Sequence, residues 1–199
     1  MAGASPQTPT PHLASLPDLL AIPEEQRMHE ILDGEVVRKA MGSGQHGTSQ
    51  LRAARLLAPF DRKPNGPARP GGWWFATEVE VELARHQVGR PDVAGWRRTA
   101  MPEPPHGYPL RRRPDWVCEV MADGDARRRD GLQKRRIYAD HGVPHYWLID
   151  TEREVLTVLR LEERGYVELL VAGRAERVRA EPFALLELQV GVLFGDDAD

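Results

Sequence analysis

Apolar and polar residues alternate most regularly in the segment WWFATEVEVELA, residues 73–84. A period of two is typical of a strand with one buried and one solvated face. We therefore predict a half-buried strand here, with Glu78, Glu80 and Glu82 on the solvated face. The residues predicted on the opposite face are Phe75, Thr77, Val79, Val81 and Leu83.

Further strands are predicted where short apolar runs are bounded by turn residues. Residues 115–122, DWVCEVMA, are apolar at both parities, which indicates a strand buried on both faces with Glu119 in its middle. Asp33-Gly34 predicts a tight turn between two strands in HEILDGEVV, and Arg164-Gly165 predicts a second hairpin. The remaining predicted strands are GRPDVAGW (89–96) and HYWLID (145–150).

Three helices are predicted from apolar spacing and from end signals. A short helix follows Pro17, a second runs from about residue 45 to 58, and a third spans DARRRDGLQKRRIYADH at 125–141. The expected N-cap of the third helix is Asp123 or Asp125, and the residues expected to end that helix are Gly142 and Pro144. This order of elements predicts an α/β (α+β) fold, in which a mixed β-sheet is flanked by helices. We expect a single domain over residues 17–195, after a flexible Pro/Thr-rich tail at 1–16.

Composition narrows the class of protein. The single cysteine, Cys118, excludes an intramolecular disulfide and a cysteine zinc cluster, and favours a reducing cytoplasm. No apolar run is long enough to span a membrane, and the first residues do not resemble a secretory signal, so we expect no membrane association. The net charge is −3, yet residues 85–136 carry 13 Lys and Arg against 7 Asp and Glu. This asymmetry indicates either an anionic partner or a solvated arginine-rich surface.

The clearest chemical signal is a pair of Arg-Pro-Asp sequences, each leading into an apolar run. They place Asp92 and Asp115 at the start of two predicted strands. If these strands are neighbours, Asp92 can converge with Glu119. Two nearby carboxylates repel unless a cation lies between them, and oxygen ligands favour Mg²⁺ or Mn²⁺. Asp115 precedes Glu119 by four residues, or about 13 Å along a strand, so both cannot bind one small ion.

Lys134, on the helix that follows, is the third candidate. A lysine near two carboxylates can hold a phosphate oxygen or orient a water, which suits metal-assisted hydrolysis of a phosphodiester. The alternative is an ion pair between Asp130 and Lys134, four residues apart on the helix, and spacing alone favours it.

These residues together carry a resemblance to a known family. GRPDVAGW, PDWVCEV and the helical Asp-Lys-Tyr pattern before HGVPHYWLID resemble the Uma-two family, a branch of the PD-(D/E)XK nuclease superfamily. HEILDGEVV and SGQHGTSQL match its N-terminal half. The resemblance implies a restriction-endonuclease-like fold, with Asp92 and Glu119 as Mg²⁺ ligands. The superfamily's lysine position holds Met121 here, so the resemblance assigns that role to Lys134 on the helix.

The resemblance also adds accessory candidates. Glu30 and His46 match family positions and Asp130 lies near Lys134, although Glu30 and His46 also fit an interpretation as surface residues. Arginines available for phosphate contacts are Arg111, Arg112, Arg113, Arg127, Arg128, Arg129, Arg135 and Arg136.

The function predicted from the sequence is metal-dependent cleavage of nucleic acid. The expected enzyme is a Mg²⁺- or Mn²⁺-dependent DNA endonuclease. One alternative is a catalytically silent nuclease-fold module that binds nucleic acid or a protein. A second is a sugar- or nucleotide-acting hydrolase that uses its carboxylates as acid and base without a metal. The sequence leaves the oligomeric state open, a homodimer included.

Overall fold

A six-stranded mixed sheet forms the centre of the computed structural model, which describes residues 12–64, 66–121 and 129–197. Its strand order is β10-β9-β8-β7-β6-β3. β7 and β8 are parallel, and the other neighbours are antiparallel. The strands are β3 (Trp73–Thr77), β6 (Val93–Arg97), β7 (Trp116–Met121), β8 (His145–Asp150), β9 (Val155–Glu162) and β10 (Gly165–Gly173). The predicted mixed sheet and the hairpin at Arg164-Gly165 are confirmed.

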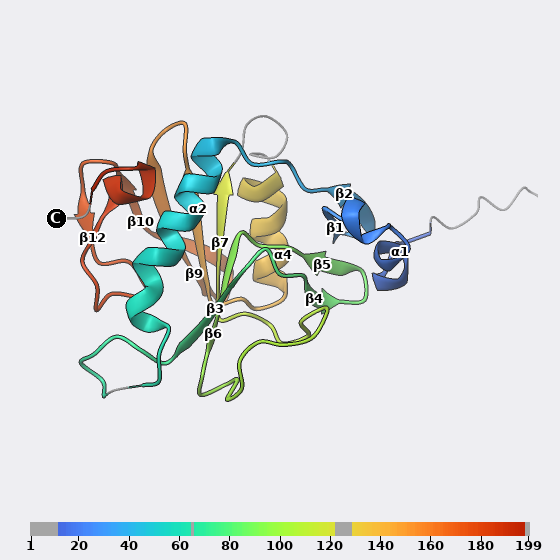
Figure 1. The fold of residues 1–199 in the computed structure, drawn as a ribbon, viewed down its shortest axis with the longest axis horizontal. Helices are drawn as coiled ribbons and strands as arrows, with labels where there is room; N and C mark the ends of the chain where they lie inside the picture. Colours follow the sequence, from blue (N-terminus) through green and yellow to red (C-terminus); the bar gives the residue numbers. More distant parts are fainter. Residues whose placement is uncertain (1–11, 65, 122–128, 198–199) are drawn as a thin grey trace, which may run out of the picture.

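A smaller sheet with the order β2-β1-β5-β4 lies beside the central one, next to α1 (Figure 1). A two-stranded ribbon, β11 with β12, follows near the C-terminus. The elements of these parts are α1 (Leu16–Leu20), β1 (His29–Leu32), β2 (Glu35–Arg38), β4 (Val81–Ala84), β5 (Gln87–Gly89), β11 (Arg177–Val178) and β12 (Leu188–Gln189). Short 3₁₀ turns occupy η1 (Glu24–Gln26), η2 (Ala58–Phe60) and η4 (Val190–Phe194).

Two helices cover the central sheet, and Figure 1 shows β7 between them. They are α2 (Gly44–Leu57) and α4 (Arg135–Asp140). Trp116, Cys118 and Val120 of β7 share a hydrophobic core with residues of α2, while Val117 belongs to a second core that includes Tyr138 of α4. Alternate residues of a strand point to opposite faces, so both faces of β7 are buried as predicted. Glu119 has the parity of Val117 and therefore points toward α4.

The prediction for residues 73–84 is wrong in two respects. The segment forms two strands in different sheets, β3 and β4, separated by residues 78–80. Glu78 has φ = 55°, a left-handed conformation that is uncommon for a residue other than glycine and that ends the strand. The solvated face is also wrong, because Glu80 is only 5% exposed and lies 3.5 Å from the Arg90 guanidinium.

The segment 89–96 is similarly divided. Its first residue ends β5, and β6 begins at Val93, so Arg90, Pro91 and Asp92 form a link between the two sheets. Proline has no N–H to donate to a strand partner, which explains the break. The consequence is that Asp92 stands at a junction of the two sheets.

The predicted helices are confirmed within the described residues, and residues 125–128 of the third lie outside them. The Ser43 hydroxyl accepts a hydrogen bond from the His46 amide at the start of α2. A π-helical turn, η3 (Arg129–Lys134), precedes α4, and Gly142 with φ = 72° follows its end. The predicted caps Asp123 and Asp125 lie outside the described residues. No helix in the described ranges is long and apolar enough to cross a membrane.

Candidate active site

Asp92 is held by three hydrogen-bond donors from three different segments. Its side chain is 1% exposed. Oδ2 accepts the Val120 amide of β7 at 2.6 Å and lies 3.2 Å from His46 Nε2 on α2. Oδ1 accepts the Lys39 ammonium at 2.7 Å. A buried carboxylate is stable only with such partners, so these three contacts fix the position of the Asp92 side chain.

The charges of these groups follow from their contacts. Burial by itself would raise the pKa of Asp92, but the His46 hydrogen bond and the Lys39 charge outweigh it, and the pKa lies well below its ordinary value. The hydrogen bond to Asp92 raises the pKa of His46 against the opposing effect of burial. Burial would lower the pKa of Lys39, but the charges of Asp92 and Glu119 raise it. Asp92 is therefore an anion and Lys39 a cation at neutral pH.

Glu119 has a second set of partners, on the α4 side of β7. Its Oε1 accepts the Tyr138 hydroxyl at 2.7 Å and the Lys134 ammonium at 3.0 Å. Lys134 also lies 3.0 Å from Glu30 Oε1, which accepts the Arg90 amide at 2.7 Å. The side chains of Glu30, Glu119 and Lys134 are 1%, 1% and 3% exposed, so this ion pair is buried.

These two sets form one group, here called the carboxylate–lysine cluster: Glu30, Lys39, Asp92, Glu119 and Lys134. Arg90 joins its halves, because its carbonyl accepts Lys39 at 2.8 Å while its amide binds Glu30. The charges of Asp92, Glu119 and Lys134 all act on Lys39. Burial and the Asp92 and Glu119 charges raise the pKa of Cys118, which precedes Glu119 on β7.

Glu78 and Gln50 lie beside the cluster. Glu78 Oε2 is 2.9 Å from Lys39 Nζ and 3.3 Å from Arg90 Nε. Gln50 donates to the Asp92 carbonyl at 2.9 Å and to Glu78 Oε1 at 3.2 Å. The side chains of Arg90 and Glu78 are 20% and 30% exposed, so the cluster approaches solvent on this side. The left-handed backbone of Glu78 is a local strain of the kind found at functional sites.

The structure brings together the main residues predicted from the sequence, Asp92, Glu119 and Lys134. The interpretation of Glu30 and His46 as surface residues is wrong, because they are 1% and 8% exposed. Asp115 lies at the other end of β7, where Oδ2 accepts the Arg97 amide at 2.8 Å. The side chain of Asp130 lies outside the described residues.

Lys39, Gln50 and Glu78 were missed in the sequence. Lys39 directly follows β2 in a segment without a recognisable motif. Glu78 lies in the regular alternation of apolar and polar residues at 73–84, so the sequence gives no sign of the turn that it forms. Only the pairing of the strands reveals that these residues meet Asp92.

The cluster suits a hard divalent cation. Its donors are carboxylate oxygens, and Glu30 Oε2 is buried without a hydrogen-bond partner among the residues that the structure describes. Within the described ranges, no three His, Cys, Asp or Glu side chains are arranged to hold a metal. Mg²⁺ commonly binds through one or two carboxylates and keeps several waters, so Asp92 and Glu119 still fit it.

The arginines predicted to bind phosphate lie on several elements outside the carboxylate–lysine cluster. Arg111 pairs with Glu82 at 3.0 Å, Arg135 with Glu168 at 3.4 Å, and Arg136 with Asp140 at 3.1 Å. Arg112 and Arg113 are exposed. Arg127 and Arg128, and the side chain of Arg129, lie outside the described residues.

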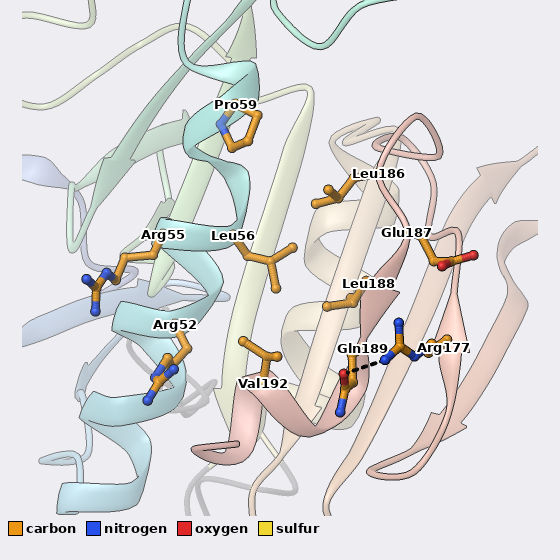
Figure 2. A pocket seen from close by; sticks show the side chains of 10 residues that line it. All are labelled: Arg52, Arg55, Leu56, Pro59, Arg177, Leu186, Glu187, Leu188, Gln189 and Val192. Carbon is orange, nitrogen blue, oxygen red and sulfur yellow. Dashed lines mark hydrogen bonds between the residues drawn. The ribbon is translucent and has the colours of Figure 1, made fainter. Parts of the chain in front are cut away.

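A cavity of about 490 Å³ lies away from the cluster, between α2 and the β11–β12 region (Figure 2). Arg52, Arg55 and Arg177 stand around it, and Leu56 and Leu188 contribute apolar surface. It shares no lining residue with the carboxylate–lysine cluster, so the candidate active site is a separate feature.

Comparisons with known proteins agree with this architecture. The model of the Uma2 family, described as "Putative restriction endonuclease", matches residues 16–192. No match was found among curated proteins. Among solved structures, the chain is similar to a putative nuclease belonging to DUF820 from Anabaena variabilis, with a TM-score of 0.70 and 20% identity. That match covers 90% of this chain and 97% of the other, so the two share a fold. Because the family match spans most of its length, this chain belongs to the Uma2 family.

Proposed function

We propose that this protein is a divalent-metal-dependent phosphodiester hydrolase that cleaves DNA. The observation that carries the proposal is the carboxylate–lysine cluster, in which Asp92, Glu119 and Lys134 are buried together where β6, β7 and η3 meet. Membership of a family described as putative restriction endonuclease and a nuclease-like fold support the same class of reaction.

Asp92 and Glu119 would hold Mg²⁺ or Mn²⁺, which, when bound, activates water and neutralises charge on the phosphate. His46 and the Val120 amide fix Asp92 through Oδ2, so that Oδ1 faces the cluster. Tyr138 and Lys134 fix Glu119 from the helix side.

Lys134 is the group best suited to act on the substrate. Its ammonium lies one hydrogen bond from Glu119, where it can orient a water or hold an oxygen of the scissile phosphate. Such a contact acts mainly in the transition state, so its loss should reduce cleavage more than DNA affinity.

The test is cleavage of supercoiled and linear DNA with Mg²⁺ or Mn²⁺. We expect Asp92→Asn and Glu119→Gln to lose at least about 100-fold in rate, since each removes one of the two charged ligands proposed for the metal. Asp115→Asn is the matched control, because Asp115 binds the Arg97 amide at the other end of β7, and it should keep its activity. Equal loss in Asp115→Asn, with the fold intact, would refute the assignment.

One feature favours a second candidate, a catalytically silent module that binds nucleic acid. Lys39 pairs with Asp92, and Lys134 pairs with Glu30 and Glu119, so each buried carboxylate has a cationic partner without a metal. Retained DNA binding by the wild type without cleavage under any metal would support this candidate and exclude the enzyme. RNA in the same assay identifies the preferred nucleic acid.

A further inference from the structure

Lys39 is the feature of the cluster that the proposed reaction does not use. Its side chain is 8% exposed, and its ammonium makes three contacts, with Asp92 Oδ1, Glu78 Oε2 and the Arg90 carbonyl, at 2.7, 2.9 and 2.8 Å. An ammonium has three protons to donate, so these contacts satisfy it completely. Lys39 is therefore fixed on Asp92.

Asp92 offers a second cation only one of its two oxygens. Oδ2 already accepts the Val120 amide at 2.6 Å and faces His46 Nε2 at 3.2 Å, which occupies both of its acceptor positions. Oδ1 has one acceptor position beyond the one that Lys39 takes. A metal bound by Asp92 must therefore share Oδ1 with Lys39 or displace it.

Sharing that oxygen is unfavourable. A Mg²⁺ ion at about 2.1 Å from Oδ1 would lie within about 4.8 Å of the Lys39 ammonium, which is 2.7 Å from the same atom. Like charges at this separation repel by an amount equivalent to roughly tenfold or more in affinity, even with the dielectric constant of water.

We propose that Lys39 is a resident cation that competes with the divalent metal for Asp92 and thereby weakens metal binding. This inference rests on the proposed function, because it requires the metal site at Asp92 and Glu119. In this arrangement Lys39 keeps Asp92 paired while the metal is absent. Glu78 and the Arg90 carbonyl then retain the ammonium when the metal takes Oδ1.

The first test measures Mn²⁺ affinity by calorimetry, without substrate. Lys39→Gln keeps hydrogen-bond donors but removes the charge, and Lys39→Met removes both. We expect either variant to bind Mn²⁺ at least about tenfold more tightly than the wild type. Lys39→Arg keeps the charge and is the matched control, with an affinity within about threefold of the wild type. Equal or weaker binding by the folded neutral variants would overturn the proposal.

A second measurement uses the wild type, so it holds even if the neutral variants do not fold. Protein labelled with ¹⁵N at the lysine ammonium groups should show a slowly exchanging Lys39 signal that is absent in Lys39→Arg. Saturating Mg²⁺ should shift this signal or speed its exchange, because the Asp92 contact is lost. A signal unchanged at saturation would overturn the proposal.

The two proposals fail in different ways. If the wild type binds metal and cleaves DNA but Lys39→Gln has the same affinity, only the role of Lys39 is wrong. If the wild type binds no metal but Lys39→Gln does, Lys39 is confirmed as the competing cation and the proposed metal-dependent function of the wild type is wrong. Absence of binding in every folded variant overturns both.

Discussion

Removing the Lys134 charge should show how strongly the fold depends on the carboxylate–lysine cluster. Lys134→Met preserves much of the side-chain length but leaves Glu119 and Glu30, each 1% exposed, without the ammonium 3.0 Å away. Breaking a buried ion pair on one side costs about 3–5 kcal/mol, because the remaining charge stays buried. This is a large part of the roughly 5–15 kcal/mol that stabilises a typical domain.

The assay is urea denaturation with linear extrapolation, supported by thermal melting. For a chain of this size, the expected loss corresponds to a fall in melting temperature of roughly 6–20 °C. Arg136→Met is the control, because its ion pairs with Asp33 and Asp140 join side chains that are 39–58% exposed, and each pair should contribute at most about 1 kcal/mol.

A double-variant cycle isolates the pair. Adding Glu119→Gln to Lys134→Met removes one of the uncompensated charges, so the double variant should be at least about 1 kcal/mol more stable than the two single losses predict. A loss of less than about 1 kcal/mol of stability in Lys134→Met, or strictly additive losses in the double variant, would refute the view that these buried charges are coupled.

Three further predictions concern other parts of the molecule. Burial lowers the pKa of His145 to about 4, so the unfolded chain takes up the proton at a higher pH than the folded chain does. The free energy of unfolding should therefore fall by roughly 2 kcal/mol between pH 6.5 and 4, after discounting for partial exposure. Denaturation at several pH values measures this dependence, and His145→Gln should remove it. Phe183→Ala removes a buried ring that makes tilted or edge-to-face contacts with five aromatic neighbours, so it should cost about 3–5 kcal/mol by urea titration, and a loss below about 1 kcal/mol would exclude it from the core. Replacing Arg111, Arg112 and Arg113 by Ala should reduce the slope of log K against log salt for duplex DNA by up to about 3, and an unchanged slope would place these side chains outside the DNA interface.

Much of the central sheet could be predicted from the sequence, because its strands carry strong local signals. The apolar residues at both parities of β7 identified a doubly buried strand, and Arg164-Gly165 located the β9–β10 hairpin. In the smaller sheet, Asp33-Gly34 located the β1–β2 hairpin. The alternation in residues 73–84 continues through the break between β3 and β4. A period of two cannot reveal that successive strands join different sheets, because that depends on which partners they find.

Only part of the candidate site could be predicted from the sequence. Asp92 and Glu119 were recognisable because a carboxylate next to or inside an apolar run needs a partner. Lys39 follows an ordinary short strand, and helical spacing favoured Asp130 as the partner of Lys134. The contacts of Lys39 with Asp92 and of Lys134 with Glu30 join residues more than 50 positions apart, and a local pattern carries no information about them.

Both the proposed cleavage and the proposed role of Lys39 require one divalent ion between Asp92 and Glu119. The most direct measurement is a crystal structure with Mn²⁺, in which anomalous scattering locates the ion. We predict one strong peak about 2.2 Å from a carboxylate oxygen of each residue, with the Lys39 ammonium moved away from Asp92 Oδ1. A saturated crystal with no peak at these carboxylates, or with the ion bound elsewhere, would contradict the account.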